Sequence, residues 1–238
     1  MLESILYYEK DLFLLLNSFH SKFWDQFMWL FSGKIAWIPV AVLFVVILSY
    51  KNRLRWKELI LVFVAIAFVI TLCDQFASGL CKHQFERFRP THHPDFMDKV
   101  NIVFDYRGGY YGFISSHAAN AFGFATLTSL IFRYTFYSVT IYTWAIVNSY
   151  SRIFLGVHFI SDIVPGIIAG IIFGWVVYKL TVIVHRKIIA GNALNSGEAI
   201  DPYKGIGIIS YMLIFTVVVM MVISMLYHFN IITALTMK

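Results

Sequence analysis

Charged residues are scarce in this chain, in which Asp, Glu, Lys and Arg make up only 13% of 238 residues. A soluble domain carries about 25%, so this composition excludes an ordinary soluble protein. Hydrophobic residues make up 59% of the sequence and aromatic residues 18%. We therefore predict a polytopic membrane protein in which residues 1–238 form a single membrane-embedded domain.

Cysteine is rarer still, because Cys73 and Cys81 are the only two. On one helix, eight residues would separate them by about 12 Å, which is too far for a disulfide. The sequence has neither a CxxC pair nor a His/Cys spacing typical of a metal site. Neither a metal nor another cofactor is predicted.

Basic tracts interleaved with aromatic residues are absent, so the net charge of +6 does not indicate a nucleic-acid partner. Loops that face an anionic lipid leaflet explain the excess of Lys and Arg. The N-terminus lacks the basic region and small-residue cleavage site of a signal peptide. We expect Leu2–Trp29 to be an interfacial amphipathic helical segment, with Trp24 and Trp29 at headgroup depth.

Long apolar runs predict an all-α bundle of six transmembrane helices. Gly166, Gly170 and Gly174 recur every four residues in one of these runs, a spacing that lets another helix approach closely. Pro39 is a possible kink in the first run. The expected spans are 27–50, 56–79, 116–136, 137–155, 159–184 and 205–227.

Six spans place alternate loops on opposite sides of the membrane. The side that holds the 51–57 loop, Arg133 and the 185–204 loop has nine Lys/Arg (51, 53, 55, 57, 133, 179, 186, 187 and 204) and three acids (58, 198 and 201). The other side has the remaining ten Lys/Arg and ten acids. The positive-inside tendency makes the first side cytoplasmic. The termini, the polar 82–114 loop and the 150–162 junction would then face outward.

The 148–162 stretch, NSYSRIFLGVHFISD, concentrates polar residues in an apolar chain. His158 and Asp162 are four residues apart and would share one helix face. The carboxylate can accept the imidazole N–H and leave the other nitrogen free to attack. A structural His/Asp pair is the alternative, but Arg152 in the same stretch favours function because ionisable groups near a membrane core are costly.

Two further polar stretches fall on the same predicted side. Lys82 and Arg89 come from the 82–90 stretch, KHQFERFRP, and with Arg152 they supply three positive charges for a phosphate. Ser115 precedes an apolar run as a helix N-cap would, so that the amides of Ser116 and His117 face an anion.

The two histidines can divide the chemistry. His158 is the better nucleophile, and His117 could protonate the leaving oxygen. The cationic cluster does what Mg²⁺ does elsewhere, so no metal is required. Near these residues, we expect Glu86 and Arg87 to be surface or headgroup contacts. Asp74 either pairs with Lys82 or Arg89 or is solvated at a helix end.

These motifs resemble the three signatures of the type 2 phosphatidic acid phosphatase superfamily. Lys82-x6-Arg89-Pro90 and Ser151-Arg152-x5-His158-x3-Asp162 match in residue type and spacing. Ile114-Ser115-Ser116-His117 stands where the family has Pro-Ser-Gly-His. The resemblance covers residues 82–162 and the six-helix layout.

The resemblance implies roles for the matching residues. His158 would form a phosphohistidine, Asp162 would orient it, and His117 would act as an acid and then activate water. The residues that would bind phosphate are Lys82, Arg89, Ser115, Ser116 and Arg152.

We therefore expect a metal-independent lipid phosphatase in a bacterial cytoplasmic membrane, with its site facing the periplasm or cell exterior. Similar bacterial family members act on undecaprenyl diphosphate, phosphatidylglycerophosphate, phosphatidic acid or lipid A phosphates. A prenyl diphosphate or phosphatidylglycerophosphate is our first expectation. The alternatives are a transporter or channel with an anion or proton site, and a lipid phosphotransferase. Nothing in the sequence specifies an oligomeric state.

Overall fold

A computed structural model describes residues 2–50, 56–189 and 206–233. Within these ranges the regular structure is helical, apart from an isolated bridge between Phe88 and Tyr111. The predicted all-α class is therefore confirmed for the described residues. The α-helices are α1 (Leu2–Leu16), α2 (Lys22–Ser32), α3 (Ile38–Tyr50), α4 (Trp56–Asp74), α5 (Lys82–Phe85), α6 (Ser116–Phe132), α7 (Thr135–Phe154), α8 (Ile160–Val184) and α9 (Gly207–His228).

Shorter helical turns join some of these helices. Two are π-helices, η2 and η5, and the others are 3₁₀ turns. Their bounds are η1 (Ile35–Trp37), η2 (Gln75–Cys81), η3 (Pro90–His92), η4 (Met97–Lys99) and η5 (His185–Ile189).

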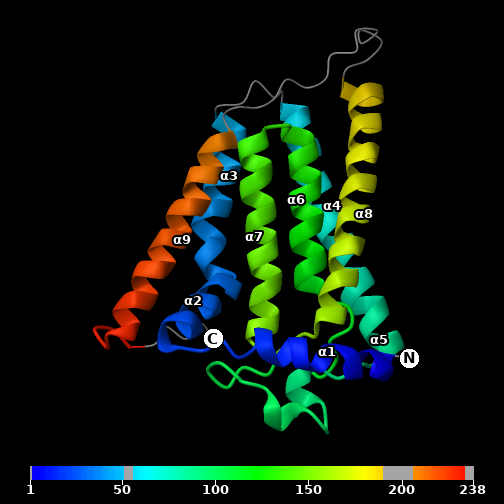
Figure 1. The fold of residues 1–238 in the computed structure, drawn as a ribbon. Coiled ribbons are helices and arrows are strands. Elements are labelled where there is room, and N and C mark those ends of the chain that lie inside the picture. The colour runs from blue at the N-terminus through cyan, green and yellow to red at the C-terminus, as the bar shows by residue number, and fades with distance from the viewer. Residues whose placement is uncertain (1, 51–55, 190–205, 234–238) are drawn as a thin grey trace.

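Figure 1 shows α3, α4, α6, α7, α8 and α9 side by side along the bundle, with α1 lying across one end. Among the residues that the structure describes, three helical stretches are long and apolar enough to cross a membrane, namely Trp56–Phe85, Ile160–Lys187 and Gly207–His228. The bent pair Lys22–Ser32 and Ile35–Ser49 would make a fourth. Helices α6 and α7, of 17 and 20 residues, lie beside them without meeting the same combination of length and hydropathy.

The first predicted span was wrong as a single helix. Residues 27–50 contain the end of α2 and all of α3, which bend by 67° at the break between them. The break comes at Gly33, whose N–H donates to the carbonyls of Trp29 and Leu30 at the end of α2. Pro39 lies in the first turn of α3. Proline is tolerated there because a residue in the first turn needs no N–H for the hydrogen bonds of the helix.

The first thirty residues also differ from the expected single segment. Helix α1 ends at Leu16, and Asn17 turns the chain before α2 begins. The buried Asn17 amide donates to the backbone carbonyls of Asn101, Ile153 and Phe154, and its carbonyl accepts from the Asn101 N–H. These bonds fasten the end of α1 beneath the end of α7.

The glycines at 166, 170 and 174 allow the close helix contact that the sequence predicts, and the partner is α6. A Cβ at Gly166 would lie 2.7 Å from the Ser115 carbonyl oxygen, and one at Gly174 would lie 2.7 Å from that of Gly123. Only hydrogen fits at these contacts. The stripe therefore fixes the start of α6 against the start of α8.

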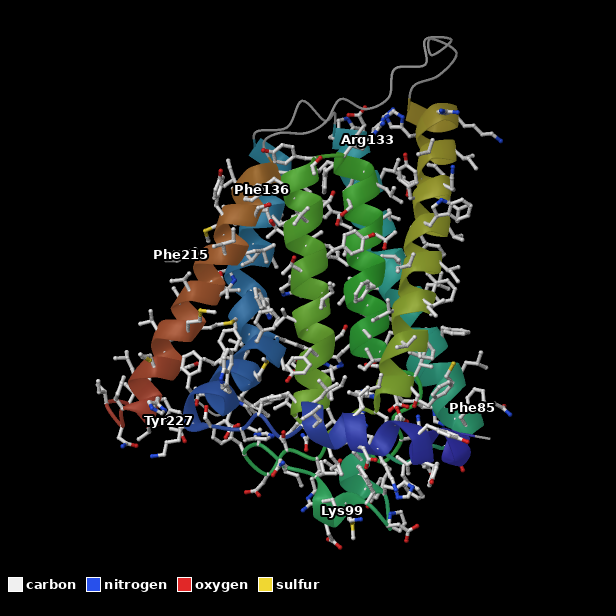
Figure 2. All side chains as sticks on the ribbon, in the orientation of Figure 1. Phe85, Lys99, Arg133, Phe136, Phe215 and Tyr227 are labelled. Carbon is white, nitrogen blue, oxygen red and sulfur yellow. The ribbon has the colours of Figure 1, made fainter. Side chains whose placement is uncertain are left out.

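The outward faces of α8 and α9 carry large exposed apolar side chains, including Trp175 and Phe215. Figure 2 shows Phe215 pointing away from the bundle. Contiguous apolar surface on long helices is typical of lipid contact. The basic residues 51, 53, 55 and 204 of the predicted cytoplasmic loops lie outside the described residues.

Candidate active site

The three polar stretches meet at one end of the bundle. Lys82 begins α5, Ser116 begins α6, Arg152 lies in the last turn of α7, and Asp162 lies in the first turn of α8. In Figure 1 these helix ends lie together near α1, whereas Arg133 is labelled at the opposite end of the bundle in Figure 2. The loop that follows α5 closes this end.

Arg89 is held by a short antiparallel pairing within that loop. Its backbone N–H donates to the Tyr110 carbonyl at 2.9 Å, and the Gly112 N–H donates to the Arg87 carbonyl at 2.9 Å. The Arg89 Nε donates to the Tyr111 carbonyl at 3.1 Å. This pairing carries the first motif to the segment that leads directly into the second.

Ser115 joins the second motif to the third. It is the N-cap of α6, as predicted, and its hydroxyl accepts from the Ala118 N–H. Its own N–H donates to the backbone carbonyl of Asp162 at 3.0 Å. Beside it, the Ser116 hydroxyl lies 3.5 Å from Lys82 Nζ. The first-turn amides of α6 have no partner within their own helix, so this end of α6 attracts anions.

His158 and Asp162 form the expected pair, and both side chains are completely buried. Asp162 Oδ2 lies 3.4 Å from His158 Nδ1 and accepts the Phe159 N–H at 3.0 Å. The 3.4 Å separation is long for a hydrogen bond, and neither ring nitrogen of His158 has a hydrogen-bond partner. Nδ1 of the imidazole therefore faces the Asp162 carboxylate, and Nε2 is free of hydrogen bonds.

His158 lies in the connection between α7 and α8, outside both helices. Burial holds the pKa of His158 well below its usual range, and the positive charges of Arg89, Arg152 and Lys82 act in the same direction, as does His117 when its ring is protonated. A neutral imidazole has a free lone pair and can act as a nucleophile. His117 and the three basic residues are therefore near enough to His158 to influence its charge.

Arg152 is anchored through both terminal nitrogens of its guanidinium. Nη1 donates to the Ser32 hydroxyl at the end of α2, and Nη2 donates to the Tyr106 hydroxyl at 3.1 Å. Its buried Nε has no partner. Ser32, just before the bend that follows α2, therefore helps to position Arg152. The Arg152 Nε–H remains available to donate to an anion.

Lys82 is connected to Asp74 through Ser78. Lys82 Nζ donates to the Ser78 hydroxyl at 3.1 Å, and that hydroxyl lies 3.4 Å from Asp74 Oδ1. Of the two readings of Asp74, the structure favours the one that pairs it with Lys82. The intervening η2 is a π-helix, a form that occurs often at functional sites.

The expectation for Arg87 as a surface residue was wrong, whereas Glu86 is exposed as expected. Arg87 is buried, and its Nη1 donates to Asp162 Oδ1 at 2.8 Å. Its Nη2 donates to Glu9 Oε1 of α1 at 2.7 Å. Sequence reasoning dismissed Arg87 because it is no part of the motif, although its spacing of two from Arg89 puts both side chains on one face of an extended segment.

Gly112 is a second position that sequence reasoning missed. A Cβ there would lie 2.8 Å from Asp162 Oδ2, 3.2 Å from Arg89 Cγ and 3.5 Å from His158 Nδ1. The backbone therefore passes directly over the pair of His158 and Asp162. No sequence signal distinguishes Gly112 from Gly108 and Gly109 in the same loop.

The arrangement suits an anion that reacts at a neutral nitrogen. Lys82, Arg89 and Arg152 supply positive charge, the start of α6 supplies oriented amides, and His158 offers a ring nitrogen that can act as a nucleophile. In the described part of the chain, no group of three or more His, Cys, Asp or Glu residues is placed to hold a metal ion.

Comparison with known proteins gives consistent matches. The sequence model of the PAP2 superfamily matches residues 59–186. The lipid A 4′-phosphatase of Porphyromonas gingivalis is 45% identical over 179 residues, which are 75% of each chain. The lipid A 4′-phosphatase of Bacteroides thetaiotaomicron is 38% identical over 181 residues, covering 75% of this chain and 79% of that protein.

One solved structure also matches. The crystal structure of Aquifex aeolicus LpxE aligns with a TM-score of 0.51 at 25% sequence identity. The alignment covers 72% of this chain and 94% of that one. The likeness therefore extends over nearly the whole of the solved chain.

Proposed function

Because the chain belongs to the PAP2 superfamily of phosphatases, we propose that it is a membrane enzyme that removes the 4′-phosphate of lipid A. The observation that carries this proposal is the buried His158, which faces the Asp162 carboxylate at the end of an apolar bundle where Lys82, Arg89 and Arg152 also lie. The names of the two curated relatives support lipid A as the substrate. They favour it over the prenyl diphosphate or phosphatidylglycerophosphate that we expected first.

The proposed reaction has two steps. His158 Nε2 attacks phosphorus while the ester P–O bond breaks, and protonated His117 gives its proton to the departing sugar oxygen. The Asp162 carboxylate then balances the positive charge that forms on His158. Neutral His117 next removes a proton from water, which attacks the phosphohistidine and releases inorganic phosphate.

Lys82, Arg89, Arg152 and the first turn of α6, including Ser115 and Ser116, would hold the phosphoryl oxygens in both steps. This cationic set would replace a metal ion. The positive charge is already in place before the substrate arrives, so little reorganisation is needed when charge builds on the phosphoryl group.

We also propose that α6 and α7 cross the membrane, which together with the four candidates gives six spans. Helix α1 would lie at the lipid–water interface, since it runs across the bundle end and exposes Tyr8 and Leu12. The site would face the periplasm of a bacterial inner membrane. Lipid chains would stay in the bilayer while the phosphate enters the polar end.

The test is phosphate release by the purified protein in detergent, with EDTA, from lipid A bisphosphate, undecaprenyl diphosphate, phosphatidylglycerophosphate and phosphatidic acid. We expect the highest kcat/KM with lipid A, with the 4′-phosphate lost. His158→Ala should lower kcat at least about 10³-fold because it removes the nucleophile.

Each contrary result counts against a distinct part of the proposal. A strict requirement for an added divalent metal would contradict the mechanism. A higher kcat/KM with another lipid would contradict the substrate. If no lipid released phosphate, the transporter alternative would replace the enzyme.

A further inference from the structure

A buried ionic network outside the three motifs ends on Asp162. Arg87 Nη1 donates to Asp162 Oδ1 at 2.8 Å, and Arg87 Nη2 donates to Glu9 Oε1 at 2.7 Å. The side chains of Arg87 and Asp162 are 2% and 0% exposed, and that of Glu9 is 9% exposed. Such a network is too well shielded from water to be an incidental surface contact.

Ser161 closes the network. Its hydroxyl accepts from Arg87 Nη1 at 2.5 Å and donates to Glu9 Oε1 at 2.6 Å. Its backbone N–H donates to Glu9 Oε2 at 2.8 Å. Glu9 therefore binds an amide in the first turn of α8, where a negative charge is favourable. The carboxylate of α1 thus fixes the helix turn that carries Asp162.

The two oxygens of Asp162 have separate partners. Oδ1 is occupied by Arg87, whereas Oδ2 accepts the Phe159 N–H and faces His158 Nδ1 at 3.4 Å. A carboxylate bound at both oxygens cannot rotate freely. The Oδ2 atom is therefore held where His158 needs an acceptor for its Nδ1 proton.

Arg87 also places a positive charge directly against the Asp162 carboxylate, which lies close to Arg89 beneath Gly112. Without it, the buried negative charge of Asp162 would attract the neighbouring Arg89, which is needed for an anionic substrate. The Arg87 guanidinium lies over the Phe159 ring, 4.7 Å from its centroid, which restricts it further. Glu9 in turn balances the charge of Arg87.

We propose that Glu9 and Arg87 are positioning residues for the reaction. Glu9 of α1 binds Arg87, Arg87 binds Asp162, and Asp162 faces His158, so α1 helps to position the imidazole. This inference rests on the proposed phosphatase function. Neither residue belongs to the three sequence motifs. A lipid-facing N-terminal helix would in this way contribute to the geometry of a catalytic imidazole that it does not itself touch.

The experiment compares Glu9→Gln, Arg87→Gln and Arg87→Lys with wild type in detergent, using phosphate release from lipid A bisphosphate and thermal unfolding. Asp11→Asn is the matched control, because it also converts a carboxylate of α1 to an amide but the residue is exposed. We expect Arg87→Gln to lower kcat on the order of 10²-fold, with KM changed less than about twofold.

Conservative replacement separates positioning from folding. Glu9→Gln should lower kcat about tenfold, and Arg87→Lys should recover part of the loss because it restores a cation beside Asp162. The double variant Glu9→Gln, Arg87→Gln should lose less than the product of the two single losses, since both act through Asp162.

Unchanged kcat in folded Glu9→Gln and Arg87→Lys proteins would overturn the inference, as would a change in KM alone or in melting temperature alone. If the wild type releases phosphate but the variants give any of these contrary results, the phosphatase proposal stands and the inference fails. A wild type that releases no phosphate would instead remove the proposed function, and the inference with it.

Discussion

Each basic residue of the site has a protein contact that orients it before a substrate arrives. Arg89 is bound to the Tyr111 carbonyl, Lys82 to Ser78, and Arg152 to Ser32 and Tyr106. Three cations close together repel one another, so these contacts are needed to hold them around one point. In the proposed reaction, this positive charge would be arranged in advance for a phosphoryl group.

The protonation of His158 gives a prediction for the pH dependence of the reaction. Burial and the surrounding positive charges lower the pKa of His158 below the usual value of about 6.5. As the proposed nucleophile, His158 would lose its lone pair only when the pH falls through this lowered pKa. We therefore expect the acidic limb of kcat/KM, which reports the free enzyme, to lie below pH 6.5.

The measurement is kcat/KM for phosphate release between pH 4.5 and 8, at constant ionic strength and with protein that remains folded throughout. Activity that already falls between pH 8 and 7 as the solution is acidified would contradict a neutral His158. Such a result would mean that the imidazole is protonated in the free enzyme.

At the scale of elements, the packing of α6 on α8 brings the second and third motifs together. The Ser115 N–H can reach the Asp162 carbonyl only because the first turns of the two helices touch. At Gly170, a Cβ would collide with the Ala119 carbonyl oxygen and lie 2.9 Å from the Gly123 N. Backbone atoms cannot move aside as a flexible side chain can.

Gly170→Ala should therefore push α6 away from α8. We expect a loss of about 1–3 kcal/mol in the free energy of unfolding, as for other overpacked interiors, together with lower kcat because the Ser115 contact with Asp162 lengthens. Thermal unfolding and phosphate release in detergent measure the two effects.

Gly109→Ala is the matched control, since a Cβ at Gly109 meets no atom within 4 Å. If Gly170→Ala and Gly109→Ala had the same unfolding temperature and the same kcat, the α6–α8 contact would be able to accommodate an extra methyl group. It would then have no special part in holding the site.

At the scale of the whole molecule, the polar site and the α1 end lie opposite the end that carries Arg133. Lys99 and Arg133 are both exposed and mark the two ends. Because the expected orientation places the site outside the cytoplasm, a reagent that cannot cross the membrane should reach one end only.

We expect Lys99→Cys to react with an impermeant maleimide in intact spheroplasts, and Arg133→Cys to react only after permeabilisation. Both substitutions are made in a Cys73→Ala, Cys81→Ala background. The native cysteines are buried, and their removal leaves a single labelled position. Labelling of Arg133→Cys alone in intact spheroplasts would reverse the proposed orientation.

The helical class, the bounds of α7, α8 and α9 to within two residues, and the residues of the motifs could be predicted from the sequence alone. Apolar runs of span length have few other solutions in a lipid environment, and His158, Asp162 and Arg152 are conspicuous because polar residues are rare here. The glycine stripe of α8 was also predictable, since its four-residue spacing marks one face of a helix.

The contacts between residues far apart in the sequence could not be predicted in this way. Glu9 is separated from Arg87 by 78 positions and Arg87 from Asp162 by 75, and no local pattern records such contacts. The bend between α2 and α3, the path of Gly112 over Asp162 and the burial of Arg87 all depend on how helices pack. A sequence lists the groups that can carry charge, but which charges neutralise each other depends on the three-dimensional neighbours that exclude water around them.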